Sequence, residues 1–452
     1  MSGTATRYLR TIKTALFGDA TTPLVFLCNF EAERYWAANH VGLPGPTLSA
    51  SVNIVARMEE LGVLLAGPDD HLILKQPVDP GYLAHLRGLG VALPNILTPE
   101  RVEPGRSTTE DVLDSPALLG TLAALGRSGA LLMPMGTTVH EEKLAAECGL
   151  PLAVPGADTF ERVNGKDYGR RIAAEAGLRM IPGQECHTVD ELADALRDCE
   201  STVVVKEAYG VSGKGLIVID EPRKAERLLA MSRRRALRSG SERMDVVVET
   251  WLPKRFDLNY QVTIGRDGSV TLDFVKQALT ESGVHKGHLI PAELSPENLA
   301  DIATAAQAIG ARLYADGFVG IAGIDAILDA HGTVYPVLEI NARLNMSTYQ
   351  GGITELLYRP DQVALARHYP LRLARPVTFA EVKDVLGPLL DAGPDGQLVP
   401  TCFGTLNANA GDASFDGRLY TLLIAPDRTR LDRLDARAQQ RLARLDLRTE
   451  QR

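Results

Sequence analysis

The sequence lacks the spacing patterns by which cysteine and histidine usually form metal sites, disulfide frameworks or covalent catalytic pairs. Its five cysteines are scattered, odd in number and never spaced as CxxC, and none of its nine histidines stands in an HExxH motif. No Cys–His or Ser–His nucleophile pattern is apparent. These absences argue against a zinc protein, a disulfide-rich secreted domain and covalent catalysis, and they suit a reducing cytoplasm.

A basic surplus and long apolar runs are also missing. The formal net charge is −9 over 452 residues, which argues against a general nucleic-acid binder. No apolar run approaches the roughly 20 residues that span a bilayer, and the N-terminal segment MSGTATRYLRTIKTALFGDA lacks the apolar core of a secretion signal. We therefore expect a cytoplasmic protein of roughly two or three domains, with no contact to nucleic acid or membrane.

The first third of the chain alternates short apolar runs, such as TPLVFLCNF and ALLMPMG, with helix-like segments. This βαβ rhythm predicts a parallel sheet with helices packed on it. The GxGxxG motif is absent after the first strand, so a dinucleotide is not indicated. The stretch CNFEAERYWA lies where ligands gather in such sheets, although core packing is the commoner role for its Phe30, Tyr35 and Trp36.

The pattern of predicted helices and strands changes near residue 155. A helix is predicted in ERVNGKDYGRRIAAEAGLRMIP, with Asn164 as its N-cap and Gly177 as its C-terminal stop. Strands follow in TVVVKEA and MDVVVETWL, a hairpin in NYQVTIG and SVTLDFVKQAL, and a long helix from SPENL. These mixed strands predict α+β lobes. The region after residue 360 is interrupted by several Pro and Gly residues and ends in a strand and a charged helix. We expect the leucines of this helix to pack on the rest of the chain or on another subunit.

The stretch GIDAILDAHGTVYPVLEINARLNMS (323–347) reads as two strands with polar side chains on one face. Glu339, Asn341 and Arg343 alternate along the second strand and so share a face with Val337, whereas Leu338 and Ile340 point toward a core. A turn near 330–333 places Asp325 opposite residues 337–339. Oxygen clusters of this kind suit magnesium, and the alternative is an exposed strand face with a salt-bridged pair.

The stretch VVVKEAYGVSGKG places Lys206 at a strand end directly before a glycine-rich turn. Glycines allow the backbone to approach phosphate, and successive N–H groups can cradle its oxygens. The loop is not a Walker A motif. Glu249 lies at the end of another apolar strand, VVVETWL. Backbone N–H and C=O groups that no longer pair within the sheet at this point can hydrogen-bond to the edge of an adenine base.

The order Lys166, Lys206, glycine loop, Glu249, and then Asp325, Glu339, Asn341 and Arg343 resembles the ATP-grasp ligases over residues of about 160–358. The resemblance implies ATP and two Mg²⁺ ions, which Mn²⁺ could replace. It implies an N-terminal Rossmann-like pre-ATP-grasp domain (1–157), a two-lobed ATP-grasp domain (158–358) and a small C-terminal α+β region packing on the catalytic core (359–452).

The same resemblance implies a role for each matching residue. Asp325, Glu339 and Asn341 would hold the metal ions, and Arg343 would steady the transferred phosphoryl group. Lys286 would contact the γ-phosphate, with His285 and His288 as further candidates in the segment that covers the site, and backbone N–H groups near Ser347 and Thr348 would stabilise an oxyanion. The ribose contact stays open between Asp257 and Asn259. ATP itself would be bound by Lys166, Lys206, Gly210, Ser212, Gly213, Lys214, Gly215, Glu249, Trp251, Leu252 and Asp257.

The whole layout, with FLCNFEAERYW near the start and LVPTCFGTLN near the end, looks like the pheganomycin-type peptide ligases. That implies joining the carboxylate of a nonproteinogenic amino acid to the N-terminal amine of a peptide in antibiotic or other natural-product biosynthesis, by an enzyme that could be a homodimer. Two alternatives stay open: a ligase that loads an amino acid onto a carrier-protein thiol, docked by the basic RRRALRSGSER (233–243), and a nucleotide-binding scaffold without catalysis.

Overall fold

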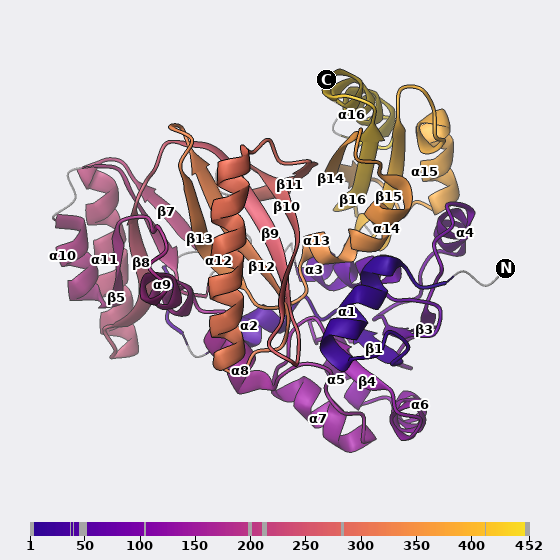
Figure 1. Cartoon of the computed structure of the whole chain (residues 1–452), viewed down its shortest axis with the longest axis horizontal. Helices are drawn as coiled ribbons and strands as arrows, with labels where there is room; N and C mark the ends of the chain where they lie inside the picture. The colour runs from indigo at the N-terminus through magenta and orange to yellow at the C-terminus, as the bar shows by residue number, and fades with distance from the viewer. Residues whose placement is uncertain are drawn as a thin grey trace.

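The computed structural model describes residues 4–36, 38, 40–44, 52–103, 105–197, 201–209, 215–281, 284–411 and 413–447. Its strands form three sheets (Figure 1). None of the helices within these ranges is long and apolar enough to cross a membrane. The predicted combination of α/β and α+β architecture is confirmed.

The N-terminal part contains a four-stranded sheet in the order β3-β2-β1-β4, and every pair in it is parallel, as the βαβ rhythm predicts. All four side chains of β1 are buried, which is typical of a central parallel strand covered on both faces. Trp36 packs in the core against Phe160, with ring centroids 5.8 Å apart. The strands are β1 (Leu24–Leu27), β2 (His71–Ile73), β3 (Asn95–Leu97) and β4 (Leu131–Pro134).

Short helices accompany this sheet. Helix α7 begins with a capping box in which Thr138 and Glu141 each satisfy a backbone N–H of the other residue. The elements are α1 (Arg7–Phe17), α2 (Ala32–Trp36), α3 (Val52–Arg57), η3 (Met58–Leu64), α4 (Pro80–Gly88), α5 (Thr108–Leu113), α6 (Pro116–Arg127), α7 (Val139–Cys148) and α8 (Ala157–Val163).

A second sheet, in the order β5-β8-β6-β7, is antiparallel and forms a lobe with its own core. Leu192 and Leu228 bring helices α10 and α11 onto this core. In Figure 1 the lobe lies at one end of the molecule. Its elements are β5 (Gly183–Thr188), α10 (Val189–Arg197), β6 (Val203–Glu207), β7 (Leu216–Ile219), α11 (Pro222–Ser239) and β8 (Arg243–Thr250).

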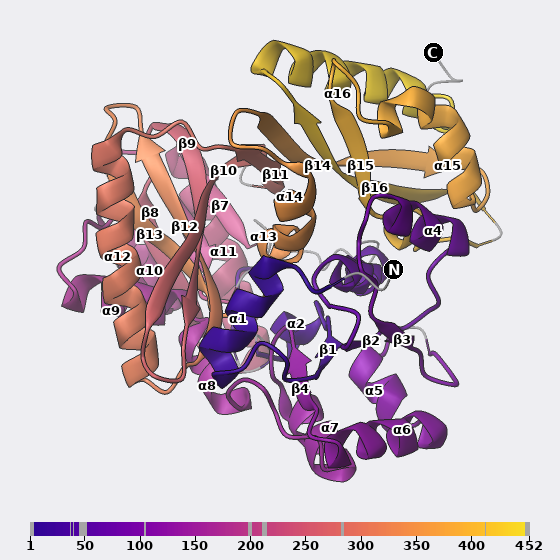
Figure 2. The same ribbon diagram turned by 45° about the vertical axis from the view of Figure 1, so that its right-hand side comes forward.

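The third sheet has eight strands in the order β13-β12-β9-β10-β11-β14-β16-β15. Its first five strands belong to the central region and its last three to the C-terminal region, and β11 pairs with β14 between them. Figure 2 shows α16 packed on the C-terminal strands. Its strands are β9 (Lys254–Ile264), β10 (Val270–Glu281), β11 (Val284–Ile290), β12 (Gly320–Asp329), β13 (Val334–Asn341), β14 (Val363–Leu373), β15 (Gln397–Cys402) and β16 (Phe415–Ala425).

Helices cover this long sheet, and three C-terminal leucines, Leu431, Leu434 and Leu442, are buried in the main core, so α16 docks on the body of the same chain. Ser295 caps α12, and Pro296 occupies its first position. The helical elements are α9 (Lys166–Glu175), α12 (Pro296–Ala315), α13 (Met346–Tyr349), α14 (Gly351–Leu357), α15 (Phe379–Leu386), η4 (Gly387–Leu390), η5 (Gly404–Leu406) and α16 (Arg428–Leu442).

The helix predicted between Asn164 and Gly177 is present as α9, but its N-cap is one residue later than expected. Asn164 is the C-cap of the preceding helix α8, and Gly165 is the N-cap of α9. The Asn164 amide donates to the carbonyl oxygens of Phe160 at 2.8 Å and Ala342 at 3.3 Å. The prediction is wrong because this side chain hydrogen-bonds backward and across the fold, whereas a capping side chain would accept from the turn that follows it.

Buried carboxylates join the N-terminal loops to one another and to the C-terminal region. Glu60 accepts the backbone N–H groups of Phe403 and Gly404 at 2.7 and 2.8 Å. Glu59, beside it, accepts from the Lys75 N–H at 2.6 Å and from the Thr108 hydroxyl at 3.0 Å. Burial raises the pKa of Glu59 to about 8, against the lowering effect of Arg57.

We expect the free energy of unfolding to fall as the pH rises from about 4.5 to about 8. A carboxyl with a raised folded-state pKa stabilises the fold fully below its unfolded pKa, and this stabilisation is lost as the pH rises through the folded value. One such proton contributes a slope of about 1.4 kcal/mol per pH unit. Denaturant titrations at several pH values should show a shallower slope for Glu59→Gln. The exposed Glu147→Gln serves as control, and an unchanged slope in E59Q would contradict the assignment.

Candidate active site

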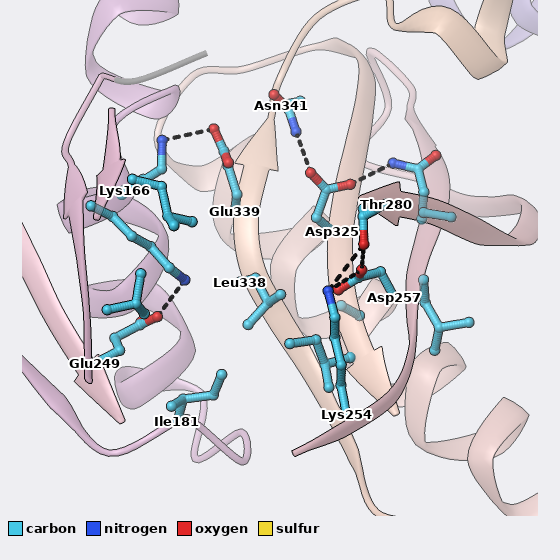
Figure 3. Close-up of a pocket in the computed structure, with 18 of the residues that line it drawn as sticks. Lys166, Ile181, Glu249, Lys254, Asp257, Thr280, Asp325, Leu338, Glu339 and Asn341 are labelled. Atoms are coloured by element: carbon cyan, nitrogen blue, oxygen red, sulfur yellow. Dashed lines mark hydrogen bonds and ion pairs between the residues drawn. The ribbon is translucent and has the colours of Figure 1, made fainter. Parts of the chain in front are cut away.

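A cavity of about 300 Å³ lies between the β5–β8 lobe and the eight-stranded sheet. Figure 3 shows its charged side chains reaching inward from both sides. Apolar side chains form part of its wall, among them Ile181, Val204, Leu216, Leu252 and Leu338. An apolar cleft with a few convergent polar groups is the usual form of a small-molecule site.

The acidic residues predicted from the sequence do meet on neighbouring strands. Asp325 on β12 is the direct partner of Glu339 on β13, which confirms the predicted register. The amides of Asn259 and Asn341 donate to the two Asp325 oxygens, at 2.8 and 3.3 Å (Figure 3). Burial, with the neighbouring charge of Glu339, raises the pKa of Asp325 to about 6. Two acids held this close favour a cation between them.

One detail of this strand differs from the prediction. Val337 was expected on the polar face and Leu338 in the core, yet Val337 belongs to the core cluster and Leu338 lines the cavity (Figure 3). The reason is an irregularity between the pairs Asp325–Glu339 and Ile327–Tyr335, where β13 uses more residues than β12. Extra residues in one strand break the alternation of side chains between the two faces.

Two of the predicted phosphate-binding lysines, Lys166 and Lys206, have acidic partners. The Lys166 ammonium lies 2.9 Å from a Glu339 oxygen, and the Lys206 ammonium lies 2.5 Å from one Glu249 oxygen. Arg170, which the sequence did not single out, lies 2.5 Å from the other Glu249 oxygen. Glu249 is only 4% exposed, so it depends on these two cations. Its carboxylate therefore connects Arg170 on α9 to Lys206 on the neighbouring strand β6.

The residues after Glu249 form one edge of the cavity. Thr250, Trp251 and Leu252 all line it, and the Trp251 N–H already donates to the Thr202 carbonyl oxygen at 2.9 Å. Asp257 also lines it and pairs with Lys254 at 2.5 Å (Figure 3). Because Asp257 and Asn259 both face the cavity, the ribose contact stays a prediction for either residue.

Arg343 and the short helix α13 close the far end. Arg343 lines the cavity and donates to the Asn341 side-chain oxygen at 2.7 Å. Asn345 caps α13 by accepting the N–H groups of Ser347 and Thr348 at 3.0 and 3.3 Å. These N–H groups were predicted to stabilise an oxyanion, but here they serve the cap. The Ser347 hydroxyl lies 3.4 Å from His288 Nε2.

Several predicted residues cannot be placed with the others. Lys286 lies on β11 with an exposed side chain and is not among the residues that line the cavity. The side chain of His285 and the whole of Gly210, Ser212, Gly213 and Lys214 lie outside the described residues. Gly215 is described and lines the cavity.

A buried lysine behind α13 was missed at the sequence level. Lys276 on β10 is 3% exposed, and burial lowers its pKa to about 7. Its ammonium lies 3.3 Å from the Ser347 carbonyl oxygen and 4.2 Å from the centre of the Phe274 ring. A lysine inside the apolar run FVKQAL was a signal for such a buried amine. The group is positioned to hold α13 in place.

The cavity residues fit magnesium and ATP. Within the described ranges, no three His, Cys, Asp or Glu side chains cluster as a metal site, so a metal at Asp325 and Glu339 would complete its shell with phosphate oxygens and water. The Asn259 side-chain oxygen is buried there without a hydrogen-bond partner. Mg²⁺, when bound, supplies positive charge between the carboxylates and the triphosphate, and the apolar wall accepts a planar base.

Two protein-family models match the chain. The Pre ATP-grasp domain matches residues 58–150, and the Carbamoyl-phosphate synthase L chain, ATP binding domain, matches residues 165–356. The butirosin acyl-carrier protein–L-glutamate ligase of Niallia circulans is 28% identical over 303 residues, which are 66% of this chain and 67% of that protein. The arginine-specific carbamoyl phosphate synthase large chain of Eremothecium gossypii is 28% identical over 57% of this chain but only 22% of its own length.

Solved structures share the fold at low identity. N5-carboxyaminoimidazole synthetase from Staphylococcus aureus, complexed with ADP, has a TM-score of 0.53 and 12% identity, covering 92% of this chain and 97% of that one. The biotin carboxylase domain of 2-oxoglutarate carboxylase from Hydrogenobacter thermophilus, with MgADP, has a TM-score of 0.53 and 13% identity, covering 92% and 89%.

The three-sheet fold, the charged cavity between its lobes and the two family matches define the class of this protein. The chain belongs to the ATP-grasp superfamily. It is an ATP-dependent ligase of this superfamily, and the resemblance stated from the sequence is confirmed at this level.

A glycine beside the cap of α13 gives a direct test of this end of the cavity. A Cβ on Gly323 would lie 2.5 Å from the Asn345 side-chain nitrogen. We expect Gly323→Ala to displace Asn345, to lower stability by about 1–2 kcal/mol and to reduce ATP-dependent turnover. Thermal melting and ADP release measure the two effects. The matched control is Gly120→Ala on α6, where a Cβ meets nothing within 4 Å; equal behaviour of both variants would contradict the packing argument.

Proposed function

We propose that this enzyme joins the carboxylate of an amino acid, of a nonproteinogenic kind, to the N-terminal amine of a peptide. ATP would phosphorylate the carboxylate, and the amine would displace phosphate, releasing ADP and phosphate. The observation that carries the proposal is the meeting of Asp325 and Glu339 with Arg343 and Lys166 at one cavity. The pheganomycin-like layout of the chain supports a peptide as the acceptor.

The chemistry explains why these groups are needed. A carboxylate is a poor electrophile, and phosphorylation supplies a leaving group. The barrier to phosphoryl transfer is mostly charge crowding, so positioned cations carry the catalysis. Lys166 and Lys206 would contact the phosphates, and Asp325, Glu339 and Asn341 would hold two magnesium ions. Arg343 would steady the transferred phosphoryl group, while the closed lobes exclude water from the acyl phosphate.

The proposal predicts ADP release only when an acid and an amine are present together. A panel of free amino acids, each tested alone and with triglycine, should show Mg²⁺-dependent release for specific pairs. Glu339→Ala should lose nearly all activity, because its partner Asp325 would face the triphosphate without a second carboxylate. The exposed Glu297→Gln on α12 should keep wild-type activity. Robust turnover by E339A would refute the metal assignment, and ADP release without an amine would refute the ligase.

A second candidate is transfer of the amino acid to a carrier-protein thiol. It is favoured by the 28% identity to a ligase named for an acyl-carrier protein and by the exposed arginines of α11, among them Arg233, Arg234 and Arg238. Leu237, in the same helix, is 84% exposed. A basic face with an apolar residue could dock an acidic carrier helix.

Product masses separate the two candidates. Incubation with ATP, a donor amino acid and an equimolar mixture of triglycine and an acidic acyl-carrier protein should add mass to the peptide alone. The double variant Arg234→Glu/Arg238→Glu should then react normally, since α11 lies away from the cavity residues. Mass on the carrier, lost in the double variant by charge reversal, would establish the second candidate in place of the first.

A further inference from the structure

A carboxylate from the N-terminal domain contacts the cavity at Arg343. Glu33 lies on α2, in the loop region that follows β1, and its Oε1 pairs with Nη2 of Arg343. The same guanidinium donates to Asn341 at 2.7 Å and to the Leu344 carbonyl oxygen at 3.4 Å. Glu33 and Arg343 are 17% and 16% exposed. The pair is therefore partly desolvated, and both side chains keep some contact with solvent.

The position of Glu33 is fixed by buried neighbours on both sides of it. Before it, Asn29 donates to the Gly136 carbonyl oxygen at 2.8 Å. After it, the indole N–H of Trp36 donates to the Thr137 carbonyl oxygen at 2.9 Å. The ring of Phe30 packs on Tyr349 of α13, with centroids 5.3 Å apart. The carboxylate is thus held at the Arg343 end of the cavity by a segment whose Phe30 and Trp36 pack in the same hydrophobic core as Tyr349.

A fixed anion at this place opposes phosphate binding unless a cation accompanies the phosphate. Arg343 can contact a phosphoryl oxygen while Glu33 stays close to it, but the two anions then repel each other. A positive group on the far side of Glu33 removes this repulsion. In the proposed reaction, the donor amino acid and the acceptor peptide both carry an ammonium group near neutral pH. Of the two, only the acceptor's nitrogen has to reach the carbonyl carbon of the acyl phosphate.

We propose that Glu33 binds the ammonium group of the acceptor and directs its nitrogen toward the acyl phosphate beside Arg343. This inference rests on the proposed function and names the subsite for its second substrate. Charge then alternates along the line phosphate, Arg343, Glu33 and ammonium. The assignment gives α2 a chemical role in addition to the packing role of its aromatic residues.

The step balances in atoms and charge. One proton of the ammonium passes to the Glu33 carboxylate, which frees the nitrogen lone pair. That nitrogen forms a bond to the carbonyl carbon of the acyl phosphate, and the bond from this carbon to the phosphate oxygen breaks. Phosphate leaves with the electron pair and takes the second proton, and the amide keeps the third.

The variant Glu33→Gln separates this role from simple positioning of Arg343. Glutamine keeps the shape and can still accept a hydrogen bond from the guanidinium, but it cannot neutralise an ammonium. The wild type and the variant are each assayed at pH 7 with ATP, the donor amino acid and one of two nucleophiles. Triglycine has a largely charged amine at this pH, and hydroxylamine is largely uncharged. We expect KM for triglycine to rise by about tenfold or more, with the hydroxylamine reaction unchanged.

Other results of these assays would contradict either the role of Glu33 or the proposed function. Equal losses with triglycine and hydroxylamine would show that Glu33 only positions Arg343 and would overturn the inference. An unchanged KM for triglycine would overturn it as well, while leaving the ligase assignment intact. No ADP release by the wild type with any donor and either nucleophile would instead remove the proposed function, and the subsite with it. Glu33→Asp should partly restore KM, and the exposed Glu147→Gln in the same domain is the matched control.

Discussion

The structure around the cavity depends on the pairing of β12 with β13, which holds Asp325 directly opposite Glu339. Burial of Asp325, and after it the repulsion from the neighbouring Glu339 carboxylate, raises the pKa of Asp325. The fold tolerates the arrangement because amide groups and Lys166 surround it. A site built from like charges has little use in a purely structural strand pair, but it is the arrangement that a divalent cation and a triphosphate require.

The cavity is assembled from parts of the chain that are far apart in sequence. The eight-stranded sheet joins the central and C-terminal regions through the pairing of β11 with β14. The buried carboxylate of Glu60 binds backbone N–H groups of the C-terminal region, and Glu33 reaches Arg343 from the N-terminal domain. Glu60 therefore connects the N-terminal part of the chain to the C-terminal region, and Glu33 connects it to Arg343 in the central region. Arg343 therefore links the cavity to α2 through its ion pair with Glu33.

Local features of the site could be predicted from the sequence, and long-range ones could not. The meeting of Asp325 and Glu339 follows from strand alternation and a short turn, both of which are encoded nearby. The exchange of Val337 and Leu338 was missed, although Pro336, which cannot donate to a ladder, was a signal for an irregular edge strand. The Glu33–Arg343 contact was beyond prediction, because it joins two segments more than 300 residues apart in the sequence.

The cations of the cavity share one property that links binding to chemistry. Lys166 is paired with Glu339, Lys206 with Glu249, and Arg343 with Glu33. In the proposed reaction these cations would turn toward phosphate oxygens, and each acid would lose its partner, which is costly unless a new positive or donor group arrives. Glu339 can then take magnesium, Glu249 an amino group of the base, and Glu33 an ammonium. The three ion pairs thus place an acid beside each cation of the cavity, and on the proposed function nucleotide, metal and acceptor would each supply the charge that such an acid needs.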